Sequence, residues 1–268
     1  MFHTIKQGTL EYLTADALEG SVHCFSTRLG GVSEGQLSSL NLGTHRGDKP
    51  ENVRENYRIL GKAVGFAPEE TVFTRQEHTD LLLRVGRADC GTGLDREQTT
   101  VCDGILTDEP GVALVCFAAD CTPVLLFDPV RQAIAAVHAG WRGTAQGIAY
   151  KAVLRMQEEF GCAPEDICAA IGPCIGRCCF EVGPEVSDAM REALGADAEA
   201  AIEPRGEKAH VDLKLLNRIW LQKAGVQVID VSPDCTMCHP DRFWSHRVTG
   251  GARGSQAAII RLKGGAAQ

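Results

Sequence analysis

Short apolar runs separated by polar and glycine-rich stretches recur along the whole chain of 268 residues. Runs of this length, bounded by turn residues and rich in β-branched side chains, are typical of buried strands. Two of them flank Asp120-Cys121, and a third ends at His138. The predicted strands are 22–27, 72–78, 81–85, 112–117, 123–127, 133–137, 167–171, 226–231 and 257–262.

Apolar residues at helical spacing alternate with these runs and predict four amphipathic helices. Capping residues and glycines mark where each helix should begin or end. We expect Asp48, Thr144 and Asp212 to act as N-caps, with Pro50 in the first turn of the first helix. The glycines expected to end helices are Gly65, Gly161 and Gly195.

The mixture of hairpin-like strand successions and strand–helix–strand units predicts an α+β fold, with helices outside a mixed sheet system. We find no internal repeat and no low-complexity linker, so we predict one domain spanning 1–268. Residues 196–208 are acidic and predicted to be irregular and exposed. The absence of Gly-x-Gly-x-x-Gly after the first strand argues against a dinucleotide-binding fold.

The net charge and the cysteine content indicate which binding partners and which cell compartment to expect. A net charge of −8 disfavours nucleic acid and anionic membranes as partners, and no apolar run is long enough to cross a bilayer. The N-terminus lacks the apolar core of a signal peptide, so we expect a cytoplasmic protein. Its twelve cysteines should then be reduced rather than paired in disulfides. The oligomeric state stays open.

Cys121 and His138 each lie at the end of a predicted buried strand, and His78 repeats this pattern. Side chains at strand ends are held in fixed positions, which suits metal ligation or nucleophilic chemistry. Taken alone, either residue could equally be a packed thiol or a histidine satisfied in a turn.

A second cysteine motif, Cys235-Thr-Met-Cys238-His239, has the form of half a zinc site. Structural zinc sites usually combine two such pairs, and no second Cys-x-x-Cys with that spacing accompanies this one. We therefore do not expect Cys235 and Cys238 to bind zinc.

Several motifs in fixed order carry a resemblance to a known family. These are Ser26-Thr27-Arg28-Leu29-Gly30-Gly31, Ser39-Leu40-Asn41-Leu42-Gly43, Asp120-Cys121, His138-Ala-Gly-Trp-Arg-Gly143, Gly172-Pro-Cys-Ile-Gly176 and Phe243-Trp-Ser-His-Arg247. Together they resemble the YfiH-type family, known as laccase-domain or polyphenol oxidase proteins, which includes mammalian FAMIN. The resemblance covers essentially the whole chain.

The resemblance implies a layered α/β/β/α sandwich, the cysteine-hydrolase fold shared with a bacterial deamidating toxin. It also implies a zinc site made of His78, Cys121 and His138. The implied reactions are phosphorolysis of adenosine, inosine, guanosine and S-methyl-5'-thioadenosine to the base and ribose 1-phosphate, and deamination of adenosine to inosine.

The chain departs from the family pattern at two places. The family usually has Gln-Val-His-Gly where this chain has Gln76-Glu77-His78-Thr79, which alters the expected edge of the pocket. Near the C-terminus the family's Gly-Arg-Gln is here Gly254-Ser255-Gln256, so an anion contact from that arginine is missing.

Two histidines and one cysteine leave one position open on a tetrahedral zinc, as in catalytic sites. Zinc in such a site can activate water for attack on C6 of adenosine. We assign no proton shuttle, because Glu77 and Asp120 neighbour ligands on predicted strands and should point to the opposite face. Phosphate needs cations, and the candidates are Arg28, Arg142 and Arg247. Asn41 and Gln76, within or beside the family motifs, are further expected substrate-binding residues.

Other functional classes remain open from the residues alone. A Cys121–His138 nucleophile–base pair without metal would make an amidase acting on a small amide or a peptidoglycan precursor. A His/His/Cys set also suits copper, which keeps a polyphenol oxidase possible. Against a multicopper centre, none of the eight histidines forms a His-x-His pair. A non-enzymatic metal-binding module is the remaining alternative, disfavoured by the glycine-lined polar loops.

Overall fold

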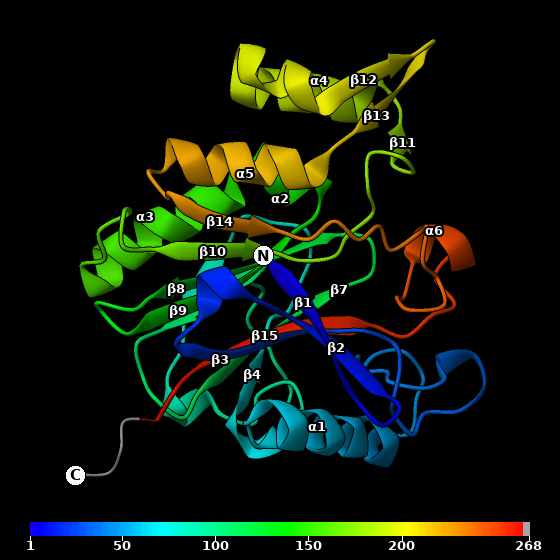
Figure 1. Cartoon of the computed structure of the whole chain (residues 1–268), viewed down its shortest axis with the longest axis vertical. Coiled ribbons are helices and arrows are strands. Elements are labelled where there is room, and N and C mark those ends of the chain that lie inside the picture. The colour runs from blue at the N-terminus through cyan, green and yellow to red at the C-terminus, as the bar shows by residue number, and fades with distance from the viewer. Residues whose placement is uncertain (265–268) are drawn as a thin grey trace.

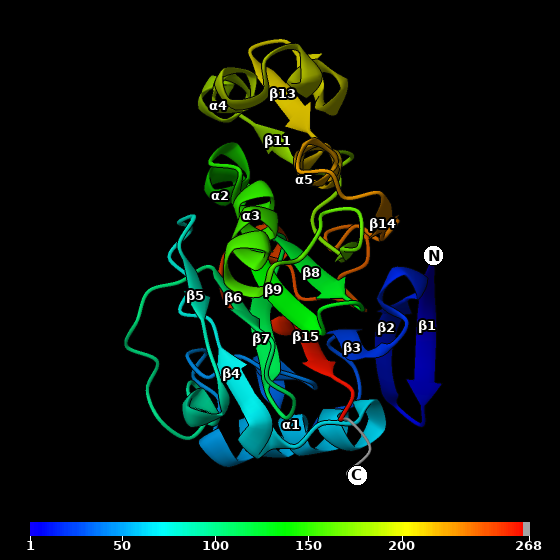
Figure 2. The same cartoon turned by 90° about the vertical axis from the view of Figure 1, so that its left-hand side faces the viewer.

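The computed structural model describes residues 1–264 and consists of two six-stranded sheets packed face to face, with helices on both outer faces (Figures 1 and 2). This arrangement confirms the predicted α+β class with mixed sheets. In Figure 1 the helix α1 (Pro50–Val64) lies at the bottom, and a small third sheet lies at the top.

The first sheet has the strand order β1-β2-β3-β15-β7-β4. Its strands pair antiparallel except at β4–β7, which is parallel. The C-terminal strand β15 therefore lies in the middle of the sheet, between β3 and β7. The bounds are β1 Phe2–Gln7, β2 Leu10–Ala15, β3 Ser21–Ser26, β15 Gln256–Leu262, β7 Ala113–Ala118 and β4 Thr71–Phe73.

The second sheet has the order β14-β10-β8-β9-β6-β5 and is also mixed, because β10–β14 and β5–β6 are parallel. Its centre is the hairpin β8–β9, in which every residue of the two strands is buried. The bounds are β14 Val228–Val231, β10 Cys168–Ile171, β8 Thr122–Asp128, β9 Ala133–Ala139, β6 Gly104–Thr107 and β5 Leu82–Arg84.

Three hydrophobic clusters define the layers. One lies between the two large sheets, where Phe25 and Leu114 of the first sheet meet Ile134 of the second. In the second cluster, α3 (Ile148–Phe160) covers the outer face of the second sheet, and in the third, α1 covers the outer face of the first. The observed layering is therefore α/β/β/α, because each sheet buries one face against the other sheet and one against helices.

A smaller unit extends from the second sheet around the three-stranded sheet β11-β13-β12. Its own cluster of buried residues joins α4 to α5. The bounds are β11 Glu181–Val182, β12 Ile202–Arg205, β13 Lys208–Val211, α2 Trp141–Ala145, α4 Pro184–Leu194, α5 Leu213–Lys223 and α6 His246–Thr249. The short 3₁₀ helices are η1 Asp16–Leu18, η2 Gly35–Leu37, η3 Pro68–Glu70, η4 Arg87–Asp89 and η5 Gly195–Ala201.

Helix ends follow the predicted chemistry at most positions. Gly65 and Gly161 end α1 and α3 in the left-handed conformation, and Asp212 caps α5 by accepting a 3.0 Å hydrogen bond from the Leu215 backbone. Two caps were wrongly predicted. Lys49 rather than Asp48 occupies the N-cap of α1, and Thr144 lies inside α2, so that Gly147 begins α3.

The strand pattern differs from the sequence-based prediction at several places. The strand predicted over 72–78 ends at Phe73, and His78 lies in a turn with a φ of 61°. Residues 196–208 are not irregular, because they form η5 and the hairpin β12–β13. The hairpin β1–β2 was not predicted, since its outer strand is mostly exposed and carries little apolar periodicity. No helix among the described residues 1–264 is long and apolar enough to span a membrane.

Candidate metal centre and active site

The structure brings His78, Cys121 and His138 together, with one potential ligand atom of each within 4.8 Å of the others. The Cys121 Sγ lies 3.7 Å from the His78 Nε2, and the two imidazole rings meet edge to face with centroids 5.0 Å apart. His138 comes from β9, Cys121 from the β7–β8 turn, and His78 from the loop after β4. Three distant chain segments thus form one donor set.

Asp120 fixes the turn that carries Cys121. Its φ of 84° lies in the left-handed region that non-glycine residues rarely adopt. Its carboxylate accepts hydrogen bonds from Thr236 Oγ1 at 2.6 Å, Ser245 Oγ at 3.0 Å and the Arg247 backbone N–H at 2.7 Å. These bonds hold the turn in its unusual conformation, so Asp120 positions Cys121.

Asp103, which the sequence did not single out, orients His138. Its fully buried carboxylate lies 2.7 Å from His138 Nδ1, so this ring nitrogen donates and leaves Nε2 toward the site. Burial alone would raise the pKa of Asp103, but hydrogen bonds from His138 and Thr79 outweigh it and lower that pKa to about 2. A carboxylate behind a ligating histidine is a common supporting arrangement in metal sites.

The same carboxylate also shapes the turn that carries His78. It accepts from the backbone N–H groups of Glu77, His78 and Thr79 at 3.1, 3.0 and 2.8 Å. One buried anion therefore positions two of the three candidate ligands. Because this loop is a turn rather than a strand, the alternation used to judge Glu77 from the sequence does not apply there.

Electrostatics favour a thiolate at Cys121. Burial would raise the pKa of the thiol, but the adjacent imidazolium of His138 and hydrogen bonds from both histidines lower it to about 6. For His138, burial opposes protonation, whereas the Cys121 thiolate and Asp103 raise its pKa to about 9. Without metal the two residues form a thiolate–imidazolium pair.

The residues fit a bound metal ion. Imidazole and thiolate donors suit zinc and also copper, and three protein ligands leave a coordination position open. Gly140 preserves the space between them, because a Cβ at this position would lie 2.7 Å from His78 Cδ2 and 3.4 Å from Cys121 Sγ. The donor set and the Asp103–His138 pair thus support a metal here, and the metal's identity is not fixed by them.

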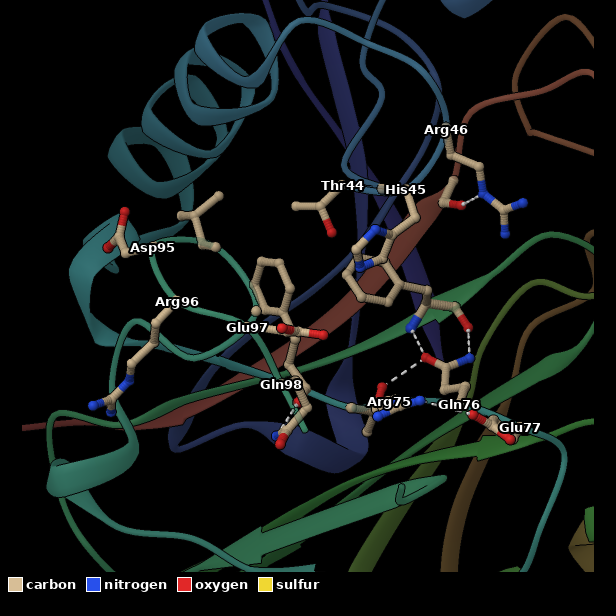
Figure 3. A pocket seen from close by; sticks show the side chains of 17 residues that line it. Thr44, His45, Arg46, Arg75, Gln76, Glu77, Asp95, Arg96, Glu97 and Gln98 are labelled. Atoms are coloured by element: carbon tan, nitrogen blue, oxygen red, sulfur yellow. Dashed lines mark hydrogen bonds and ion pairs between the residues drawn. The ribbon is translucent and has the colours of Figure 1, made fainter. Parts of the chain in front are cut away.

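A cavity of about 660 Å³ is lined in part by Gln76 and Glu77, the two residues directly before His78, although none of the three candidate ligands lines it. Figure 3 shows Arg46 at one end and Asp95 and Arg96 at the other, with His45 facing the interior. The cavity combines aromatic and polar lining. Its remaining lining residues are Gly43, Thr44, Phe73, Thr74, Arg75, Gly93, Leu94, Glu97, Gln98, Phe117 and Ser255.

Of the predicted substrate-binding residues, only Gln76 lines this cavity. Its side-chain amide pairs with the Phe117 backbone, accepting from its N–H at 2.6 Å and donating to its carbonyl at 2.9 Å. Asn41 is buried, and both ends of its amide are occupied by Gly43, Asp48 and Ser255. In this conformation Asn41 organises the loop around it.

The three predicted phosphate ligands lie apart from the cavity lining. Arg28 stacks on Trp244 at 3.9 Å and donates to two backbone carbonyls. Arg142 is exposed, over the ring of Trp141, and Arg247 donates to the Glu181 carbonyl at 3.1 Å. Arg142 is two residues after Gly140, and the Arg247 backbone N–H bonds to the Asp120 carboxylate, so both lie closer to the candidate metal centre than Arg28 does in sequence or by contact.

Arg46 and Arg253 form a cation pair that the sequence reasoning missed. Both donate to Ser255 Oγ, from Arg46 Nε at 3.1 Å and Arg253 Nη1 at 3.3 Å. Neither forms a salt bridge with any carboxylate in residues 1–264, and Arg253 Nε is buried without a partner. Burial, reinforced by Arg46, lowers the pKa of Arg253 to about 10. Ser255 thus stands where the family has arginine, yet two guanidinium groups converge on it.

The comparison with protein families decides the classification. A family model described as multi-copper polyphenol oxidoreductase laccase matches residues 22–263. The chain belongs to this laccase family. The YfiH-type resemblance drawn from the motifs is thereby confirmed.

Relatives and solved structures agree with membership of the laccase family. A purine nucleoside phosphorylase of Bacteroides thetaiotaomicron is 38% identical over 247 residues, which cover 90% of this chain and 91% of the relative. Purine nucleoside phosphorylase YfiH of Escherichia coli is 37% identical over 229 residues, covering 85% and 89%. The crystal structure of YlmD from Geobacillus stearothermophilus has a TM-score of 0.91 at 36% identity, covering 97% of this chain and 99% of that chain.

Proposed function

We propose that the protein is a zinc-dependent purine nucleoside phosphorylase of the cytoplasm. The observation that carries this proposal is the convergence of His78, Cys121 and His138 beside a cavity of about 660 Å³. The names of the relatives supply the substrate class. We include adenosine, inosine, guanosine and S-methyl-5'-thioadenosine as nucleosides, and hydrolytic deamination of adenosine as a second reaction.

The cavity is suited to a nucleoside. Phe73 and Phe117 meet edge to face with ring centroids 5.1 Å apart, and both line the cavity, so an aromatic wall is available to a purine. His45 adds a polar group on that wall, and the Gln76 amide, which pairs with the Phe117 backbone, fixes the aromatic side of it. In this arrangement the purine packs on the aromatic side, and the ribose extends along Gln76 and Glu77 toward His78.

Phosphate requires cations that are not already neutralised, and Arg46 and Arg253 meet this condition best. They share the Ser255 hydroxyl as a neutral acceptor, and the half-buried Arg253 has a buried Nε without a partner, which an anion bound between the two guanidinium groups would satisfy. Arg46 lines both the nucleoside cavity and a second cavity of about 380 Å³ that also contains Arg253. Arg142 and Arg247 are further phosphate candidates.

In phosphorolysis a phosphate oxygen forms a bond to the ribose C1' while the bond from C1' to the purine nitrogen breaks. Zinc held by the three ligands would supply a Lewis acid able to stabilise developing negative charge and to activate water for deamination. Asp103 keeps His138 oriented throughout the reaction. The positive charges of Arg46 and Arg253 bind the phosphate anion, and the phosphate in turn offsets the repulsion between the two guanidinium groups. The departing base needs a proton, which solvent reaching the exposed His78 side can supply.

The direct test is incubation of the zinc-loaded protein with inosine, with and without phosphate. We expect hypoxanthine and ribose 1-phosphate only when phosphate is present. The variant Arg253→Met should raise the KM for phosphate with little change in the KM for inosine, while Arg28→Met serves as an arginine control. Equal hypoxanthine release without phosphate would identify a nucleoside hydrolase and overturn the proposal.

A cysteine hydrolase is the second candidate, because the thiolate–imidazolium pair of Cys121 and His138 is oriented by Asp103 as in nucleophilic triads. Peptide mapping after iodoacetamide treatment separates the two functions. We expect zinc to protect Cys121 and chelation to expose it. Rapid labelling in the zinc-loaded protein would favour an amidase on a peptidoglycan precursor. Diphenol turnover appearing only with copper would support the polyphenol oxidase alternative.

A further inference from the structure

A second group of potential metal ligands lies outside the site described above. Cys178 and Cys179 lie in the loop between β10 and β11, and Cys235 and Cys238 lie between β14 and α6. The four sulfur atoms all lie within 4.8 Å of one another. The Cys178–Cys238 and Cys179–Cys238 sulfur separations are 3.6 and 3.4 Å. These separations are far longer than a disulfide bond of about 2.05 Å, and all four thiols are free.

The spacing is close to that of four thiolates around one zinc ion. Zinc–sulfur bonds of about 2.3 Å in a tetrahedron place neighbouring sulfurs about 3.8 Å apart. The sequence argument against Cys235 and Cys238 was that no second Cys-x-x-Cys exists. The structure supplies the missing pair as the adjacent residues Cys178 and Cys179, a spacing that motif reasoning does not recognise.

The surrounding backbone supports a thiolate cluster. The Gly176 N–H donates to Cys235 Sγ at 3.1 Å, as backbone amides do around metal-bound sulfur. A Cβ on Gly176 would lie 3.1 Å from Cys178 Sγ, so glycine lets the loop close around the sulfurs. Cys178 and Cys238 are exposed, which gives an ion access from solvent. The cavity beside the cluster carries both cations and carboxylates, among them Lys214 and Asp212.

We propose that Cys178, Cys179, Cys235 and Cys238 bind a second zinc ion with a structural role. Four thiolates fill its coordination, which leaves no open position for substrate. The ion would clamp the loop after β10 to the segment after β14. This proposal does not depend on the proposed nucleoside chemistry.

The two clamped segments also hold the turn that carries Cys121. The Ile175 N–H donates to the Asp120 carbonyl at 3.0 Å, and Thr236 Oγ1 donates to the Asp120 carboxylate at 2.6 Å. Ile175 lies three residues before Cys178, and Thr236 directly follows Cys235. A zinc ion in the cluster therefore stabilises the frame around the catalytic centre without contacting substrate.

Zinc analysis of protein purified under reducing conditions tests this site. We expect two zinc ions per chain in the wild type, one in Cys121→Ala, one in Cys238→Ser and none in the double variant. Cys168→Ser, a cysteine remote from both groups, should keep two. Equal zinc content in the wild type and in Cys238→Ser, iron in place of zinc at the cluster, or an intact-mass loss of two hydrogens from a disulfide would each overturn the proposal.

Cobalt spectroscopy provides a second readout if Cys238→Ser fails to fold. In the Cys121→Ala protein only the four-cysteine cluster remains to bind cobalt. We expect an intense sulfur-to-cobalt charge-transfer band and the visible bands of tetrahedral cobalt. Absence of these bands in folded Cys121→Ala protein would contradict the proposed site.

Discussion

The two sulfur-containing groups of potential metal ligands differ in how many donors each offers. The His78/Cys121/His138 group offers three candidate ligands, with a buried carboxylate behind one of them and a cavity lined by the residues directly before His78. The four-cysteine cluster offers four sulfurs and a backbone N–H donor to one of them. In zinc proteins an open coordination position accompanies catalysis, whereas a closed set of four ligands accompanies structural stabilisation. Loss of one group should therefore remove activity, and loss of the other should remove stability.

The largest effect is expected for Cys121→Ala. Removal of the sulfur should lower inosine phosphorolysis by about 10³-fold, since a Lewis acid contributes several kcal/mol and each ~1.4 kcal/mol is a factor of ten. The thermal midpoint should change little. Steady-state kinetics and thermal unfolding of the same preparation check both expectations. A large fall in stability with activity retained would reverse the roles assigned to the two groups.

For Cys238→Ser we expect the opposite pattern. Loss of a structural metal belongs to the few mechanisms that cost more than about 4 kcal/mol, which corresponds to a fall in Tm of about 10 °C for a protein of this size. Activity per folded molecule should fall much less than in Cys121→Ala. Calorimetry beside active-site titration distinguishes these outcomes. An unchanged Tm would remove the structural role.

Asp103→Asn should lower zinc affinity at the His/Cys/His centre by about 10–100-fold, because the carboxylate orients His138 and the His78 turn. The four-cysteine cluster should keep its metal. Asp108→Asn is a matched control. Asp103 directly precedes β6 and Asp108 directly follows it, but Asp108 pairs with Arg84 on the surface at 3.1 Å. Competition with a chromophoric chelator measures both affinities. Equal affinities in the two variants would contradict the positioning role of Asp103.

Metal binding at the His/Cys/His centre should depend on pH in a defined window. In the metal-free protein Cys121 has a pKa of about 6 and His138 of about 9, so between these values Cys121 is charged and His138 protonated. Zinc must then displace one proton, and affinity should rise about tenfold per pH unit from 6 to 9 and level off above. Calorimetry in buffers of different ionisation enthalpy counts this proton. A flat affinity across this window would show that His138 is neutral.

The smallest effect is expected for Asp212→Ala, which should lower the stability of the protein without removing a metal ligand. Asp212→Ala removes the cap of α5 and should cost about 1 kcal/mol. Both zinc ions should remain bound, because α5 contributes no ligand. Denaturant unfolding and metal analysis check this. Loss of zinc in this variant would mean that general destabilisation, rather than ligand removal, explains the Cys238→Ser result.

The sequence predicted most of the fold because the central strands carry continuous apolar runs, as 112–117 and 133–137 do. Helix ends at Gly65 and Gly161 were equally clear, since glycine suits the left-handed conformation found there. The β1–β2 hairpin was missed because β1 is mostly exposed and its residues therefore show little apolar periodicity.

The candidate site was only partly predictable. His78, Cys121 and His138 carried signals in strand ends and family motifs. Asp103 looked like an ordinary turn residue, because its partners lie 24 to 35 positions away in sequence. Arg46 and Arg253 meet only through the loop around Ser255, and the cysteine pairs lie about 60 positions apart. Such long-range juxtapositions arise from topology, which spacing rules do not report.

The central place of β15 in the first sheet has a consequence for synthesis of the chain. Residues 256–262 pair with β3 on one side and β7 on the other, so both neighbours must wait for the last strand before the sheet can close. Until then two hydrophobic strand edges are open to pairing with other chains. Folding is thus dominated by contacts between distant segments, which are slow to form. A chain truncated before Gln256 should accumulate in insoluble material, although it retains every ligand of both proposed metal sites.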